Sequence, residues 1–137
     1  MKKSITQEFD YGCGVACFAF VTGLTYKQAV EVLGRGQTVT HGWRPSDLTK
    51  ALNDYGLSYR NNYVRKLNAD SDYLDGTIIL IERSEEYKVG HYLVQYKGKW
   101  MDPWVNMPQD GVLAHAKSGF REQLPGKAMY AIIPLTS

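Results

Sequence analysis

Residues 7–21, QEFDYGCGVACFAFV, constrain this chain more than any other stretch of its sequence. Gln7 stands six positions ahead of Cys13, and a glycine lies on each side of that cysteine. An apolar segment of helical length, residues 13–22, begins at the cysteine and is followed by Gly23, a residue type that commonly ends helices. The segment is apolar nearly all round, so it predicts a buried helix with Cys13 in its first turn.

A cysteine at the start of a helix is suited to nucleophilic chemistry. The thiolate is the attacking form, and the free N–H groups and positive dipole end of a helix N-terminus favour an anion. Gly12 and Gly14 allow a tight approach and leave no Cβ to obstruct a substrate. Attack on a carbonyl creates an oxyanion, for which the Cys13 N–H and the Gln7 carboxamide are the expected donors. The alternative is that Cys13 is a small apolar core residue, a common role of free cysteines.

Size and charge limit the classes of protein to which the chain can belong. We expect residues 1–137 to form a single domain, because that length buries a sufficient core without further support. The net charge of +2 comes from scattered basic and acidic residues, so nucleic acid is not an expected partner. No apolar run approaches the roughly 18 residues that span a bilayer, and the N-terminus lacks the apolar core of a signal peptide. We therefore expect a soluble, cytoplasmic protein.

The chain holds only two cysteines, four positions apart, and this spacing argues against both a disulfide and a metal site. On a helix, Cys13 and Cys17 lie on one face and are poorly placed to bond to each other. As half of a zinc site they find no second pair of ligands, because the histidines are isolated from one another. We expect no metal and no cofactor, and we expect Cys17 to pack in the core.

Helical patterns occupy the first part of the sequence and strand patterns the second. The expected helices are residues 13–22, residues 26–33 with Thr25 as N-cap, and a third that Ser46 or a neighbour caps and Gly56 ends. The expected strands are an edge strand at 57–63, a central strand at 76–82, a hairpin turning at 97–99 and a closing strand at 128–135. Loops are expected at 34–43 and 83–89, a loop or short helix at 66–76, and a short helix at 111–119. Helices followed by antiparallel strands predict an α+β fold.

A nucleophilic cysteine needs a base, and the chain offers three histidines. His41 falls in a glycine-rich loop and His115 in the expected short surface helix, so both are typical of solvated surface residues. His91 differs, because it opens a strand directly after Gly90. We therefore expect His91 to be the base.

The expected pairing of residues in the hairpin places a carboxylate near His91. With a two-residue turn, Asp102 lies on the same face as His91 and opposite Leu93 or Gln95. In the register that pairs it with Leu93, Asp102 is a diagonal neighbour of His91, about 7–8 Å away between backbones. A three-residue turn would place it on the other face. Asp102 is the expected orienting group, and the alternative is a polar cross-strand pair without chemistry.

The order of these motifs resembles that of a known family. The Q-x5-C-G-x-A-C pattern from Gln7 to Cys17, then GHYLV and then DP, is similar to the C39 peptidases, papain-like domains that process bacteriocin leader peptides at the front of export transporters. The resemblance implies a papain-like fold of N-terminal helices packed on a C-terminal antiparallel sheet. It also implies Cys13 as nucleophile, His91 as base, Asp102 as orienting group and Gln7 in the oxyanion hole.

Two departures from the family pattern are visible. The family often has Asp immediately before its cysteine, where this chain has Gly12. The chain also carries no membrane or ATPase domain, so we expect a stand-alone form. The cysteine, the glycine after it and the helix all remain, so the first departure leaves the chemistry in place.

Together these features predict a cysteine peptidase that hydrolyses a peptide or protein substrate through a Cys-His-Asp triad. Family members commonly cleave after a double glycine in a leader peptide, which implies such a substrate and an association with an export system. The residues expected to border the substrate are Gly12, Gly14, Gly90 and Trp104, although cross-strand packing would equally explain Trp104. The alternatives are a cell-wall amidase or deamidase with the same Cys-His pair, and a catalytically inactive module that binds a peptide or partner.

Overall fold

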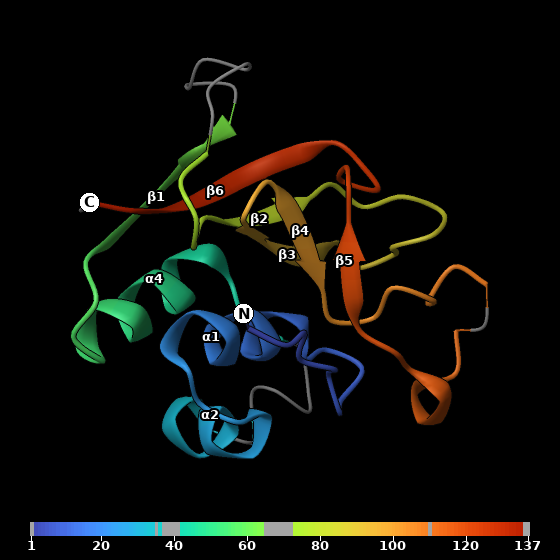
Figure 1. Ribbon diagram of the computed structural model, residues 1–137, viewed down its shortest axis with the longest axis horizontal. Coiled ribbons are helices and arrows are strands. Elements are labelled where there is room, and N and C mark those ends of the chain that lie inside the picture. The colour runs from blue at the N-terminus through green and yellow to red at the C-terminus, as the bar shows by residue number, and fades with distance from the viewer. Residues whose placement is uncertain (1, 35, 37–41, 65–72, 110, 136–137) are drawn as a thin grey trace.

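The computed structural model describes most of the chain, and its helices lie on one side of a sheet (Figure 1). The described residues are 2–34, 36, 42–64, 73–109 and 111–135. His41, most of the expected loop at 34–43 and most of the expected segment at 66–76 therefore lie outside the described residues.

Helix α1, Cys13–Thr22, has the bounds that the sequence predicts. Gly23 ends it in the left-handed conformation at φ +82°, and its N–H donates to the carbonyl of Ala19. Residues 14–20 are all buried, because α1 is enclosed by α2, α4 and strand β3. Among the described helices, none combines the length and apolar character needed to cross a bilayer.

The other two described helices begin in different ways. Helix α2, Tyr26–Leu33, starts with a capping box in which the Thr25 side chain accepts from the N–H of Gln28, as the sequence predicts. Helix α4, Pro45–Asp54, has Arg44 at its N-cap and no side-chain capping bond. The prediction of Ser46 as cap was wrong, because Pro45, which has no N–H to satisfy, occupies the first helical position.

The six strands within the described residues form one antiparallel sheet in the order β1-β6-β2-β3-β4-β5. Their bounds are Tyr59–Tyr63 (β1), Ile78–Ile81 (β2), His91–Tyr96 (β3), Lys99–Asp102 (β4), Gly119–Arg121 (β5) and Ala128–Pro134 (β6). The edge position of β1 and the central position of β2 agree with the sequence prediction. The expected helix at 111–119 is wrong in extent: a single 3-10 turn, Leu113–His115, is followed by β5, which sequence reasoning missed.

The β3-β4 hairpin has the two-residue turn that the predicted geometry required. Lys97 and Gly98 both have positive φ, +50° and +79°, which is the type I′ conformation that matches strand twist. The pairing of Val94 with Met101 and of Tyr96 with Lys99 continues to place Asp102 opposite Leu93. This is the closer of the two predicted registers.

Side chains on the two faces of the sheet fill two separate cores. Figure 1 shows the helices gathered on one side of the twisted sheet. On that side Tyr92, Val94 and Met101 pack with the buried residues of α1. On the opposite side Leu93 and Trp100 pack with Tyr87, Ile79 and Ile81. This alternation follows the two-residue period of strands. The start of β3 lies next to the start of α1, because a Cβ on Gly14 would meet the Tyr92 ring at 3.2 Å.

Burial of Cys17 generates a stability prediction. Its side chain is fully buried among the residues of the helix-side core. We expect Cys17→Ala to lower the free energy of unfolding by about 1–2 kcal/mol, because it leaves a small cavity. Guanidinium denaturation followed by circular dichroism measures this, with the rate of Cys13 alkylation as the control that should not change. An unchanged unfolding midpoint would contradict a packing role.

Candidate active site

The predicted nucleophile, Cys13, is the first residue of α1 and is partly exposed. Its N-cap is Gly12, whose carbonyl accepts from the N–H of Ala16 at 3.1 Å and from the Tyr26 hydroxyl at 3.2 Å. The turn before the helix is closed by the N–H of Gly12, which donates to the carbonyl of Phe9 at 3.0 Å. The cysteine therefore lies at a fixed helix start, as the sequence predicts.

The glycines on either side of Cys13 are explained by packing. A Cβ on Gly12 would lie 1.9 Å from the Tyr26 hydroxyl oxygen, and one on Gly14 would lie 3.0 Å from a methyl carbon of Leu48. Both glycines are buried behind the cysteine. They let α1 approach its neighbours closely, which is a different use of the missing Cβ from the substrate access expected of them.

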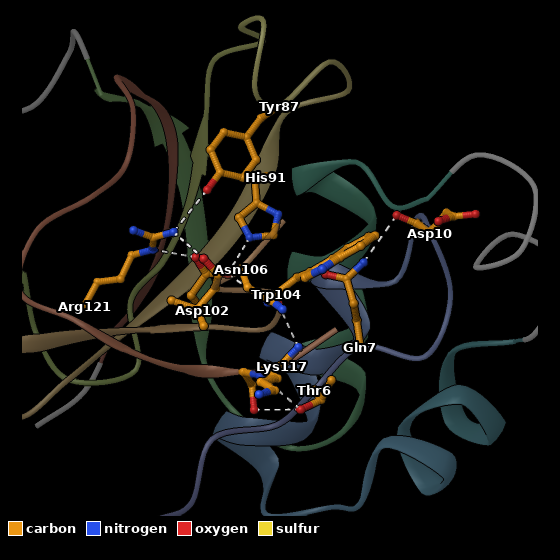
Figure 2. A network of polar contacts seen from close by, with 12 residues as sticks. Thr6, Gln7, Asp10, Tyr87, His91, Asp102, Trp104, Asn106, Lys117 and Arg121 are labelled. Carbon is orange, nitrogen blue, oxygen red and sulfur yellow. Dashed lines mark hydrogen bonds and ion pairs between the residues drawn. The ribbon is translucent and has the colours of Figure 1, made fainter. Parts of the chain in front are cut away.

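The hairpin brings the predicted base and orienting group into contact. His91 Nε2 lies 2.6 Å from Asp102 Oδ1, and the two side chains are 3% and 0% exposed. The same carboxylate oxygen accepts from the backbone N–H of Trp104 at 2.9 Å. Asp102 Oδ2 accepts from Arg121 Nε at 2.6 Å, so both oxygens have partners (Figure 2).

These contacts favour the charged forms of both groups. Burial alone lowers the pKa of His91, but hydrogen bonds to Asp102 and Cys13 and the negative charges of both raise it to about 9. Burial raises the pKa of Asp102, but the bond and charge of His91 and the bonds from Arg121 and Trp104 lower it below its ordinary value. Because Nε2 is held by Asp102, Nδ1 is the imidazole nitrogen left to serve Cys13.

Two residues that sequence reasoning missed complete this cluster. The Tyr87 ring stacks on the His91 imidazole with centroids 4.8 Å apart and planes 22° apart. Arg121 Nη2 donates to the Tyr87 hydroxyl at 3.2 Å and to the carbonyl of Val105 at 3.0 Å. Tyr87 lies in a segment whose sequence indicates only a charged loop, and Arg121 lies in a strand of three residues. Neither segment has a periodic pattern long enough to signal these contacts.

The Gln7 side chain lies beside the same site with its amide hydrogens engaged. Its Nε2 donates to the carbonyls of Phe9 at 2.9 Å and Asp10 at 3.3 Å, whereas its Oε1 is buried with no hydrogen-bond partner among the described residues. Its backbone N–H donates to the carbonyl of Pro103 at 3.2 Å. The carboxamide is thus fixed next to the segment that follows Asp102.

An open cleft of about 650 Å³ joins these groups. Cys13, His91, Gln7 and Gly90 all line it. Its apolar walls come from both layers of the fold and include Tyr11, Trp43, Leu80, Val89, Met107 and Met129. The cleft therefore exposes the sulfur and the imidazole to a ligand of peptide size.

Three residues that were expected to border a substrate do not line this cleft. Gly12 and Gly14 are buried behind the helix start, and Trp104 is only 3% exposed. Trp104 follows Asp102 and Pro103 at the end of β4 and contributes its backbone N–H to the carboxylate. Of the four expected residues, the structure brings only Gly90 to the cleft, directly before His91.

The remaining cysteine and histidines lie apart from the cleft or beyond the described residues. Burial, together with the charges of Cys13 and Asp102, raises the pKa of the Cys17 thiol well above its ordinary value, so this group stays protonated. His115 is exposed in the 3-10 turn. Among the described residues, no group of three His, Cys, Asp or Glu side chains is arranged to hold a metal ion.

Comparisons with known proteins agree with this architecture at the level of the fold. The peptidase domain of Streptococcus ComA, a bifunctional ABC transporter involved in a quorum-sensing pathway, has a TM-score of 0.56 at 16% identity, over 98% of this chain and 99% of that one. A double glycine motif protease from an AMS/PCAT transporter, solved with its leader peptide, has a TM-score of 0.57 at 18% identity, over 96% and 89%. The peptidase domain of Streptococcus mutans ComA gives 0.54 at 16% identity, over 98% and 100%.

No protein-family model and no curated protein matches the sequence. At these identities the likeness to solved structures establishes the fold alone. The chain has the α+β, papain-like fold of these transporter peptidase domains, with N-terminal helices packed on a C-terminal antiparallel sheet. This confirms the expected fold class and agrees with the fold that the C39 resemblance implies.

The raised pKa of His91 predicts how stability varies with pH. Folding raises this pKa from its ordinary 6.5 to about 9, so the folded state holds a proton that the unfolded chain has lost between those values. The contribution is fully present below pH 6.5 and is lost as the pH rises through 9. We expect wild type to lose about 2–3 kcal/mol of stability relative to His91→Gln across this range. Urea denaturation at several pH values measures it.

A matched control is available for this measurement. His115→Gln removes an exposed histidine, so its stability should follow the wild-type pH dependence. Parallel pH profiles for wild type and His91→Gln would mean that His91 gains no proton on folding.

Proposed function

We propose that this protein is a cysteine peptidase with Cys13 as nucleophile, His91 as general base and acid, and Asp102 as orienting group. The observation that carries the proposal is the buried 2.6 Å contact between His91 and Asp102, in a cleft that also exposes Cys13 at a helix N-terminus. A polar cross-strand pair without chemistry would not need a nucleophile beside its free imidazole nitrogen.

The proposed reaction begins with the Cys13 proton on His91. The pKa of about 9 keeps the imidazole protonated at neutral pH. The thiolate attacks the substrate carbonyl, and the C–N bond breaks as His91 gives its proton to the leaving amine. His91 then takes a proton from water, which attacks the thioester and releases the acid product. The buried Asp102 carboxylate stabilises the imidazolium in each step.

The proposed oxyanion hole combines the backbone N–H of Cys13 with the Gln7 carboxamide. In the free protein Gln7 Nε2 donates to two loop carbonyls, and the bond to Asp10 is the longer at 3.3 Å. We propose that the substrate oxyanion takes the place of the Asp10 carbonyl, while the 2.9 Å bond to Phe9 holds the amide in position.

We propose a peptide or protein substrate with small residues at the scissile bond, as the double glycine motif in the name of one structural neighbour suggests. The apolar walls of the cleft are suited to the side chains on either side of that bond. An association with an export system, a single peptidase domain over residues 1–137 and a cytoplasmic location belong to the same proposal.

One observation favours the second candidate, an inactive module that binds a peptide or partner. The amide hydrogens of Gln7 already have acceptors within the chain, so the oxyanion hole is not open in the free protein. The third possibility, a cell-wall amidase or deamidase, uses the same cysteine and histidine. Comparing the digestion of peptidoglycan with that of glycine-rich leader peptides distinguishes it from a peptidase.

Substitution of the nucleophile tests the proposal directly. We expect Cys13→Ala to abolish cleavage of a panel of Gly-Gly peptides and adduct formation with their aldehyde analogues, because no other thiol among the described residues lines the cleft. Mass spectrometry measures both. Cys17→Ala is the control and should keep both activities. Residual turnover by Cys13→Ala would refute the assignment.

Substitution of Gln7 tests the oxyanion hole separately. We expect Gln7→Ala to lower kcat by about 100-fold to 1000-fold with little change in KM, because the lost donor acts mainly in the transition state. Steady-state kinetics on a cleaved peptide give the two constants. Gln7→Glu, which keeps the shape but replaces the donor with an acceptor, should be at least as slow. A change in KM alone would assign Gln7 to substrate binding instead.

A further inference from the structure

One guanidinium contacts both groups that hold the imidazole. Arg121 Nε donates to Asp102 Oδ2 at 2.6 Å, and Nη2 donates to the Tyr87 hydroxyl at 3.2 Å. A third bond, from Nη2 to the carbonyl of Val105 at 3.0 Å, fixes the guanidinium to the backbone. Figure 2 shows Arg121 reaching from β5 toward Tyr87 and Asp102, with His91 beyond them.

The imidazole is restrained at one edge and on one face. Asp102 holds Nε2 at the edge, and the stacked ring of Tyr87 covers a face at 4.8 Å. Both of these side chains are fully buried, so neither position can be taken over by water. Rotation of the His91 ring would break the hydrogen bond and the stacking together, so the direction of Nδ1 depends on these two residues.

Only an arginine can make this set of contacts. The planar guanidinium presents several N–H donors in a rigid fork, whereas a lysine ammonium is a single point of charge on a flexible stem. Without the fork, Asp102 Oδ2 has no other donor among the described residues, and the carboxylate is held at Oδ1 alone, by His91 and the Trp104 N–H. The Tyr87 hydroxyl loses its partner in the same step.

We propose that Arg121 and Tyr87 are positioning residues of this site: the Arg121 fork orients the Asp102 carboxylate and the Tyr87 ring, and these two direct His91 Nδ1 toward Cys13. The inference rests on the proposed function for the roles of Cys13 and His91. Neither positioning residue touches the substrate in this account, and both act through His91.

A positioning role and a simple charge effect of Arg121 predict opposite results. The charged and titratable groups that face His91 are Asp102, Arg121, Tyr87 and Cys13. If Arg121 acts only as a positive charge, its removal raises the pKa of His91, because a repelling charge is lost. If it positions Asp102, its removal weakens the bond that stabilises the imidazolium, and the pKa falls toward the value that burial imposes.

The experiment compares Arg121→Met, Arg121→Lys and Tyr87→Phe in the full chain. The His91 titration midpoint is read by NMR of ¹⁵N-labelled histidine, assigned by the signal missing in His91→Gln. The alkylation rate of Cys13 by iodoacetamide against pH is read by mass spectrometry. Arg60→Lys, an exposed arginine on β1, is the control and should match wild type in both. Both readouts work without a peptide substrate, so a lack of cleavage by wild type would refute the peptidase and leave this test valid.

We expect Arg121→Met and Arg121→Lys to move the His91 midpoint to lower pH and to slow alkylation at pH 7 about 10-fold. This effect is smaller than the one expected when the orienting carboxylate itself is removed. Tyr87→Phe keeps the ring and should shift both readouts in the same direction by less. Wild-type behaviour of Arg121→Lys, or a higher midpoint in Arg121→Met, would overturn the proposal. If the arginine variants do not fold, Tyr87→Phe decides alone, and wild-type values for it count against the proposal.

Discussion

The buried carboxylate of Asp102 is the constraint on which the rest of the site depends. A charge with no exposed surface is costly unless hydrogen bonds and an opposite charge replace water. Here the imidazole of His91, the backbone N–H of Trp104 and the guanidinium of Arg121 make that replacement. Each of these three groups comes from a different part of the sheet or its loops. Their hydrogen bonds to one carboxylate therefore fix the first residue of β3, the end of β4 and the end of β5 relative to one another. The high pKa of His91 is a result of the same arrangement.

The site is assembled where the two layers of the fold meet. The helical layer supplies Cys13 at the start of α1, and the sheet supplies His91 at the start of β3. Because α1 packs against β3 with a fully buried interior, the two starts stay in a fixed relation. Apart from the turns that precede α1 and β3, neither layer needs an unusual backbone conformation at the site. The chemistry proposed for the cleft therefore requires no strained segment, only the correct packing of one helix on one strand.

Much of the architecture follows from local sequence patterns, and the remainder depends on contacts that no local pattern records. The bounds of α1, the cap at Thr25 and the hairpin turn at Lys97 and Gly98 are all properties of short segments. The hairpin even predicts the approach of Asp102 to His91, because register follows from turn length. Arg121 and Tyr87 lie outside such patterns: a strand of three residues gives no periodic signal, and a stacked tyrosine in a charged loop depends on tertiary packing. The packing of Gly12 and Gly14 was missed for a related reason, since a missing Cβ serves equally well to admit a neighbouring side chain.

The contact between Gly12 and Tyr26 also limits which sequences this scaffold can adopt. The tyrosine hydroxyl occupies the volume in which any other residue at position 12 would place its first side-chain carbon. An aspartate before the cysteine, as in many C39 peptidases, is therefore compatible with this backbone only after the tyrosine has lost its hydroxyl or moved. Positions 12 and 26 are therefore coupled: a side chain can be added at one only together with a new rotamer or a smaller residue at the other.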